Sequence, residues 1–145
     1  MAVALLIRPT VDHTLIDEAT IETNGEIILN ALDLGNAELS ILLTDDEEMR
    51  QLNNDYRNKN RTTDVLSFPQ DDDDGSEITL LGDIVISLPV AQAQAEELGH
   101  PLTKEIDRLM THGILHLIGY DHEQGAEEEK LMHDKEDELL ALLPR

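Results

Sequence analysis

The first half of the chain alternates short apolar runs with longer amphipathic stretches. Four runs have the length and the apolar content of β-strands: AVALLI at residues 2–7, AELSILLT at 37–44, TDVLSF at 63–68 and LLGDIVIS at 80–87. Between the first two, residues 11–32 space their apolar side chains as a helix does, although Gly25 lies near the middle. We therefore expect four strands and a first helix over 11–32, which Gly25 can interrupt.

Helical patterns dominate the rest of the chain. Thr44, followed three residues later by Glu47, is a capping-box signature, so a short helix should begin there with Thr44 as its N-cap. Three further segments have helical character, at 88–98, 102–118 and 123–142. Strands that first alternate with helices and then give way to helices alone are typical of an α+β fold. We expect one domain over residues 1–145, in which about five helices pack on a small mixed four-stranded sheet.

Composition narrows the class of protein. The chain has no cysteine, which excludes disulfides and thiolate metal sites, so a transition metal must be bound by His, Asp or Glu. Its longest purely apolar run is MAVALLI at 1–7, far short of the roughly 20 residues that cross a bilayer, and no basic stretch precedes it. We expect a soluble, cytoplasmic chain without a membrane partner. The run QDDDDG at 70–75 fails the pattern of a calcium loop and is interpreted as a solvated turn.

The net charge of the chain and the distribution of its basic residues give opposite indications about a nucleic-acid partner. The formal net charge is −22, which argues against a nucleic-acid partner because affinity for phosphate comes largely from Lys and Arg. Four of the ten basic residues nevertheless fall close together, at Arg50, Arg57, Lys59 and Arg61. This stretch is therefore a local electropositive region in an acidic protein.

Three histidines lie in the segment THGILHLIGYDH at residues 111–122. His112 and His116 are four positions apart in the expected helix 102–118, so their side chains share one face at the margin of its apolar stripe. Gly119 can take the positive φ that ends a helix and turn the chain, so that His122 folds back toward the other two. We expect the three imidazoles to converge and to leave one coordination position open.

A tris-imidazole site suits zinc, one ion per chain, and can also bind nickel or cobalt. Three protein ligands plus a water are typical of a catalytic metal, which lowers the pKa of its bound water to near 7. Any one of these histidines alone would be an ordinary surface or core residue. The frame H-x-x-x-H-x-x-G-x-x-H predicts a metzincin-like histidine helix, although Gly113 replaces the glutamate that serves metzincin proteases as general base.

Three blocks of the sequence resemble the YbeY family of bacterial metal-dependent endoribonucleases. They are LNNDYRNKNRTTDVLSFP, LLGDIVIS and HGILHLIGYDH, and together they span Leu52–His122, roughly half the chain. The resemblance implies an α+β fold, a functional arginine at Arg57 and a zinc-type ion on His112, His116 and His122. It also implies single-stranded RNA as the substrate. The implied setting is maturation of ribosomal RNA at the 3′ end of 16S, the small ribosomal subunit and ribosome quality control.

The residues also permit this reaction on chemical grounds. RNA cleavage must stabilise charge on a phosphorane-like transition state, and a divalent metal with a guanidinium is a sufficient pair. We expect Arg57 to supply the guanidinium, Lys59 and Arg61 to position the strand, and Tyr56 or Tyr120 to stack a base. The alternative is an ordinary solvated loop. The nucleophile is open between water and the ribose 2′-hydroxyl.

Some features leave alternatives in place. Asn60 and Thr62 stand where members of the family often carry Asp and Pro. His13, His100 and His133 are isolated and are interpreted as surface residues. An endoribonuclease is the leading hypothesis, a metzincin-type metallopeptidase without the usual glutamate is the second, and a non-catalytic ribosome-associated factor with a structural metal is the third. The oligomeric state is left open.

Overall fold

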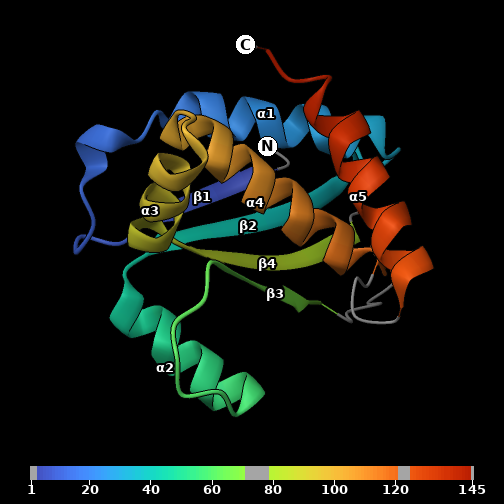
Figure 1. Cartoon of the computed structure of the whole chain (residues 1–145). Coiled ribbons are helices and arrows are strands. Elements are labelled where there is room, and N and C mark those ends of the chain that lie inside the picture. The colour runs from blue at the N-terminus through green and yellow to red at the C-terminus, as the bar shows by residue number, and fades with distance from the viewer. Residues whose placement is uncertain (1–2, 71–78, 121–124, 145) are drawn as a thin grey trace.

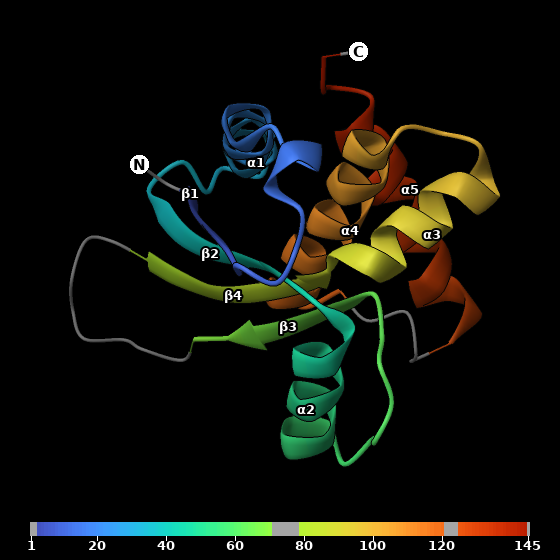
Figure 2. The same cartoon turned by 90° about the vertical axis from the view of Figure 1, so that its left-hand side faces the viewer.

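A four-stranded mixed sheet divides the molecule into two unequal sides (Figures 1 and 2). The computed structural model describes residues 3–70, 79–120 and 125–144. The strands are β1 (Val3–Ile7), β2 (Ala37–Thr44), β3 (Val65–Pro69) and β4 (Thr79–Ser87). The described α-helices are α1 (Glu18–Ala31), α2 (Asp46–Arg57), α3 (Leu88–Leu98), α4 (Leu102–Leu117) and α5 (Ala126–Leu140). These elements confirm the expected α+β class.

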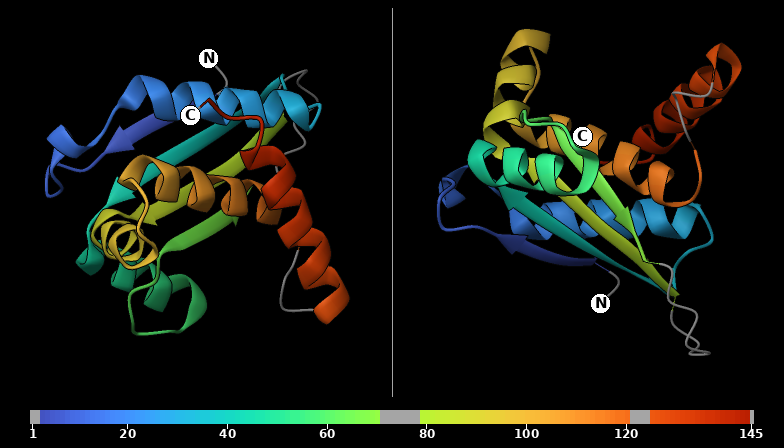
Figure 3. Two further views of the ribbon diagram at one scale, coloured as in Figure 1. Left: turned by 45° about the horizontal axis from the view of Figure 1, so that its top comes forward. Right: turned by 90° about the horizontal axis from the view of Figure 1, so that it is seen from below.

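The sheet has the order β1-β2-β4-β3, in which β1, β2 and β4 run parallel and β3 pairs antiparallel with β4. Helices α1, α3, α4 and α5 lie on one side of it, while α2 lies on the other, as the view from below shows (Figures 2 and 3). The main core fills the first side, where β2 contributes Ala37, Leu39, Ile41 and Leu43 on alternate positions. A smaller cluster of Met49, Leu66 and Val85 lies under α2.

The first helix differs from the sequence-based expectation. It begins at Glu18, because Asp17 caps it by accepting a hydrogen bond from the backbone N–H of Thr20, and a short 3-10 turn over His13–Leu15 precedes it. Gly25 does not interrupt it. A Cβ atom at Gly25 would meet Val3 Cγ2 at 3.0 Å, so glycine here allows α1 to approach β1.

Other boundaries shift by a few residues. Thr44 ends β2, and the N-cap of α2 is Asp45, whose carboxylate accepts from the backbone N–H of Glu48 at 2.9 Å. The expected cap at Thr44 was therefore wrong by one residue; its hydroxyl bonds to the carboxylate of Glu48 instead. The last helix begins at Ala126 rather than 123 and ends at Leu140 rather than 142. Residues 71–75 of the expected acidic turn lie outside the described residues.

Helix α4 crosses the sheet and brings its C-terminal end over β3 and β4 (Figure 1). The loop at 58–64 joins α2 to the start of β3 (Figure 1), and its residues line one cleft together with the C-terminal part of α4. In the described part of the chain, no helix is long and apolar enough to span a bilayer. The end of α4 and the 58–64 loop together position the candidate site.

Candidate metal centre and its cleft

Helix α4 holds His112 and His116 on one face, as their spacing predicts. Their Nε2 atoms are 3.1 Å apart, and the ring centroids are 4.6 Å apart at an interplanar angle of 73°. Both side chains are half-buried, beside an apolar face that includes Ile106, Leu109 and Met110. Two imidazole nitrogens therefore meet at one point on the margin of the core.

The helix ends where Gly119 predicts. Gly119 has φ +108°, a backbone conformation that residues with a Cβ atom rarely adopt. Its N–H donates to the His116 carbonyl at 3.1 Å, and the N–H of Tyr120 donates to the Leu115 carbonyl at 3.0 Å, which is the Schellman pattern. His122 follows within residues 121–124, which lie outside the described residues. Its role as a third ligand stays a prediction.

Within the described ranges, no three His, Cys, Asp or Glu side chains gather as a complete metal site. The two histidines are nevertheless compatible with one ion, because two nitrogens at about 2.0–2.1 Å from a tetrahedral zinc lie about 3.3 Å apart. The observed separation of 3.1 Å is close to that value. The donor set that is described therefore fits a zinc-type ion.

Gly113 packs against the sheet and does not face the cleft. A Cβ atom at this position would lie 2.9 Å from Ile84 Cδ1 of β4. The Gly113 carbonyl accepts a hydrogen bond from the hydroxyl of Ser67 on β3 at 3.3 Å. A glutamate here would clash with β4, so this position offers neither the general base of a metzincin nor the space for one.

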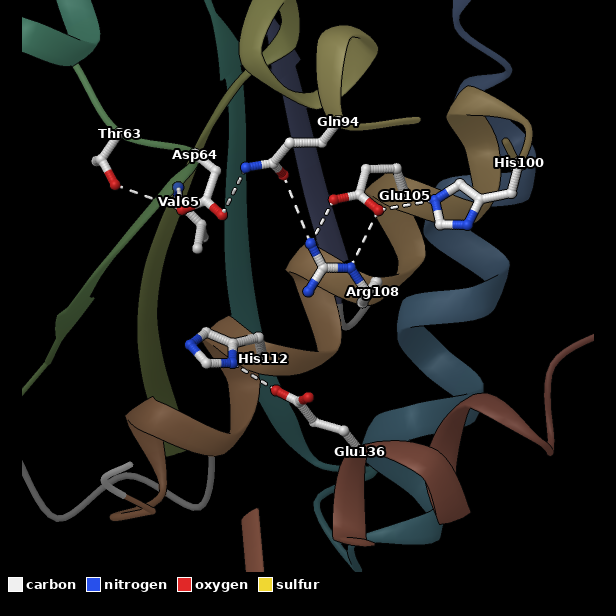
Figure 4. A network of polar contacts seen from close by, with 9 residues as sticks. All are labelled: Thr63, Asp64, Val65, Gln94, His100, Glu105, Arg108, His112 and Glu136. Atoms are coloured by element: carbon white, nitrogen blue, oxygen red, sulfur yellow. Dashed lines mark hydrogen bonds and ion pairs between the residues drawn. The ribbon is translucent and has the colours of Figure 1, made fainter. Parts of the chain in front are cut away.

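A glutamate that the sequence did not reveal touches the first histidine (Figure 4). Glu136 of α5 has a relative exposure of 8%, and its Oε1 bonds to Nδ1 of His112. Its neighbours along the buried face of α5 are Met132 and Leu139. The available signal in the sequence was the spacing of Glu136, which places it on the same helical face as Met132 and Leu139. That spacing did not indicate that its partner would be His112.

The histidines open onto a cleft of about 940 Å³. Its lining includes every described residue for which we expected an RNA contact, together with Asp64 and both histidines: Tyr56, Arg57, Lys59, Arg61, Asp64, His112, His116 and Tyr120. Arg57 is the last residue of α2, and the side chains of Arg57, Lys59 and Arg61 are all exposed. The fold thus brings cationic side chains and two imidazoles to one concave surface, although they are about 55 residues apart in sequence.

Hydrogen bonds tie the cationic loop, which we define as residues 57–64 with Arg57, Lys59 and Arg61, to α2. Asn53 of α2 donates from Nδ2 to the Arg61 carbonyl at 2.9 Å. Arg50 donates to the side chain of Asn60 at 2.6 Å and pairs with Glu47 at 3.3 Å. Arg50 therefore stabilises the loop, and it is not among the residues that line the cleft. The hydroxyl of Thr62 is 3.3 Å from the carboxylate of Asp46. Asn60 and Thr62, the two departures from the family pattern, are both anchored.

A polar network lies one helical turn before the histidines (Figure 4). Glu105, which is fully buried, accepts from Arg108 Nε at 3.0 Å and contacts His100 Nε2 at 2.8 Å. The hydrogen bond with Glu105 and the negative charges of Glu105, Asp64 and Glu136 raise the pKa of Arg108, against a smaller opposing effect of burial. His100 is thus not an isolated surface residue: its side chain is 17% exposed and has a carboxylate partner.

The same network reaches the wall of the cleft. Arg108 approaches Oε1 of Gln94 at 3.5 Å, and Gln94 donates to Asp64 Oδ2 at 3.3 Å. The other oxygen of Asp64 accepts from the backbone N–H of Val65 at 2.8 Å, where β3 begins. These contacts connect α4 through α3 to the end of the cationic loop (Figure 4).

The aromatic side chains near the cleft differ in exposure. Tyr56 is 69% exposed, and its ring stands edge-to-face with Phe68 at a centroid distance of 5.2 Å. Phe68 packs against the small cluster of Met49, Leu66 and Val85. Tyr120 is half-buried beside the main core. Tyr56 therefore presents more open ring surface than Tyr120 for stacking.

This chain is similar to several known proteins. A family model described as Endoribonuclease YbeY matches residues 10–144. A protein named Endoribonuclease YbeY from Sulfurihydrogenibium sp. is 49% identical over 135 residues, covering 93% of this chain and 89% of that protein. Another with the same name from Aquifex aeolicus is 51% identical over 125 residues, covering 86% and 83%. The solution structure of TM1509 from Thermotoga maritima is 27% identical with a TM-score of 0.68, covering 97% of this chain and 88% of that one.

Proposed function

The chain belongs to the endoribonuclease YbeY family, and from that premise we propose that it cleaves single-stranded RNA with the aid of one zinc-type ion. One observation carries the proposal. Two converging imidazoles and three exposed cations line the same cleft, in a protein whose net charge is otherwise −22. Positive side chains attract the phosphate groups of RNA. Their concentration beside potential metal ligands therefore favours a phosphodiester as the substrate.

His112 and His116 would hold the ion, with His122 as the third ligand. The separation of 3.1 Å between the two described Nε2 atoms supports this assignment, and nickel or cobalt would fit the same donors. When bound, such an ion supplies a Lewis acid that stabilises negative charge and acidifies water.

The cationic wall of the cleft would bind the RNA backbone. Arg57 would contact the phosphate that is cut, because a guanidinium can donate two parallel hydrogen bonds to its oxygens as negative charge develops. Lys59 and Arg61 would bind neighbouring phosphates and so fix the register of the strand. Tyr56, supported edge-on by Phe68, would stack one base, which favours single strands because their bases are unstacked.

The biological setting rests on the family relationship. We propose ribosomal RNA and the small ribosomal subunit as partners, maturation of the 3′ end of 16S and ribosome quality control as the processes, and the cytoplasm as the compartment. The metallopeptidase alternative is disfavoured by the contact between Gly113 and Ile84. The endoribonuclease hypothesis therefore stands first.

The test uses the full chain loaded with zinc and then freed of excess metal. Elemental analysis should find about one zinc ion per chain. The protein should cut labelled single-stranded RNA, leave casein intact, and lose activity in chelator until zinc is restored. His116→Ala should be inactive, while the matched variant His133→Ala, which removes an exposed histidine of α5, should remain active. Cut casein would support the peptidase instead, and intact RNA with bound metal would support the non-catalytic factor.

A further inference from the structure

His112 and Glu136 meet where α4 and α5 pack against each other. We propose that Glu136 is a positioning residue, which holds His112 in the tautomer and orientation that bind the metal. The inference rests on the proposed function, because it concerns how this chain prepares one ligand of the same site. It adds a residue from α5 to a site otherwise built from α4 and the cationic loop.

The burial of Glu136 needs an explanation. A carboxylate in an apolar surrounding is costly unless a donor or a cation compensates it. Glu136 lies on the buried face of α5 between Met132 and Leu139, with a relative exposure of 8%. The contact with His112 Nδ1 supplies a donor, and Arg108 lies close enough for the charge of Glu136 to act on it. The carboxylate therefore has a hydrogen-bond donor, and a cation near enough to interact with its charge, to offset the cost of burial.

The contact also decides which ring nitrogen of His112 carries the proton. A carboxylate accepts hydrogen bonds, so Nδ1 must be the protonated nitrogen of the neutral ring. Nε2 then carries the lone pair, and this atom faces His116 Nε2 at 3.1 Å. The nitrogen that points to the expected metal position is therefore the one able to bind it. Carboxylates that accept from metal-binding histidines in this way raise the basicity of the ligand and fix the ring plane.

The position of Glu136 allows metal binding to be tested separately from RNA binding. Glu136 is not itself part of the cleft lining and contacts it through His112, so replacing it leaves Arg57, Lys59, Arg61 and Tyr56 unchanged. Its loss should therefore change metal affinity first and RNA binding little. Glu129 on the same helix is exposed, so its replacement by Gln removes the same charge without touching His112.

The test compares wild type with Glu136→Leu, Glu136→Gln and the control Glu129→Gln. Zinc affinity is measured by competition with a chromophoric chelator. We expect Glu136→Leu to weaken zinc binding about 10- to 100-fold. Glu136→Gln should weaken it less, because the amide oxygen still accepts from Nδ1, and Glu129→Gln should match wild type. Circular dichroism checks that each variant is folded, and the near-isosteric Gln variant provides a measurement if the Leu variant does not fold.

A second readout needs no metal. Nitrogen NMR of the metal-free protein, with the His112 signals assigned from their loss in His112→Gln, should show a proton on Nδ1 in wild type. In Glu136→Leu that preference should be lost. Equal zinc affinities of wild type and both Glu136 variants, or a proton on Nε2 in wild type, would overturn the inference alone. Failure of wild type itself to bind zinc would instead overturn the proposed function, and the inference with it.

Discussion

The two halves of α4 carry polar side chains on the same face but use them differently. In the N-terminal half, Glu105 is fully buried and is held by Arg108 and His100. In the C-terminal half, His112 is 23% exposed at its side chain and lies with His116 on the wall of the cleft. The spacing along the helix is alike in both halves, at three or four residues.

The difference shows that environment, rather than residue type or spacing, separates a structural cluster from a functional one. Glu105 forms an ion pair with Arg108, and its contact with His100 attaches α4 to the segment that joins α3 to α4. This cluster therefore stabilises the fold. The charged partner of His112 is Glu136, which bonds to Nδ1, while the ring itself lines the cleft. The first arrangement should control stability and the second should control activity, and the following changes test that division.

The largest effect should come from the histidines. His112→Ala, His116→Ala and His122→Ala should each lower cleavage by at least about 10³-fold, because a site with two ligands holds the metal too weakly for transition-state stabilisation. His112→Ala should also destabilise the fold, since it leaves Glu136 buried without that donor. Single-turnover kinetics and urea unfolding provide the two readouts, and near-normal activity with bound metal would show that a histidine was wrongly assigned.

A change in the N-terminal half should act on stability instead. Glu105→Ala should cost roughly 2–4 kcal/mol of unfolding free energy, somewhat less than a fully buried ion pair, because Arg108 keeps partial contact with solvent. The matched variant Glu47→Ala breaks an exposed pair with Arg50 and should cost under about 1 kcal/mol. Urea unfolding compares the two. If Glu105→Ala retained full stability but lost the activity of the folded fraction, the division between the halves of α4 would be wrong.

The cationic loop allows catalysis to be separated from attraction to RNA. Arg57→Ala should lower the saturating cleavage rate about 10²-fold, because its contact strengthens as charge develops. Lys59→Ala and Arg61→Ala should leave that rate alone, weaken RNA binding and reduce the salt dependence by about one unit of slope each. Single-turnover cleavage at saturating enzyme over several salt concentrations distinguishes them. An unchanged rate in Arg57→Ala would reduce that residue to a positioning role.

The smallest effect concerns Asp107, a buried carboxylate of α4 that accepts a hydrogen bond from Asn24 at 3.0 Å. Burial raises the pKa of Asp107 above its ordinary value of 3.8, and the bond from Asn24 opposes this. The folded state therefore holds the proton more tightly than the unfolded chain, so this group costs stability as the pH rises above about 3.8.

Asp107→Asn keeps an acceptor for Asn24 and removes that cost. It should be more stable than wild type at pH 7, by less than about 1.5 kcal/mol, and the advantage should shrink as the pH falls toward 3.8. Thermal unfolding between pH 3.5 and roughly 7.5 measures the difference over this titration range. An advantage that grows on acidification would contradict the prediction.

Much of the site could be predicted because its signals are local. The spacing of His112 and His116 places them on one face of any α-helix, and Gly119 marks where that helix ends. Local signals were also the source of small errors. Thr44 and Asp45 are both good N-caps, and only the length of β2, set by pairing with its neighbours, decides between them.

The sequence by itself determined which segments are strands and helices, where the potential ligands lie and where positive charge is concentrated. These properties depend on residues within about four positions of one another, because periodicity, capping and turn preferences act over one helical turn or one strand pair. Tertiary structure alone decided that Glu136 stands behind His112, that Glu105 joins His100 to Arg108, and that the cationic loop faces the histidines. Such contacts arise when helices pack on a sheet, and sequence spacing does not encode which distant side chains that packing brings together.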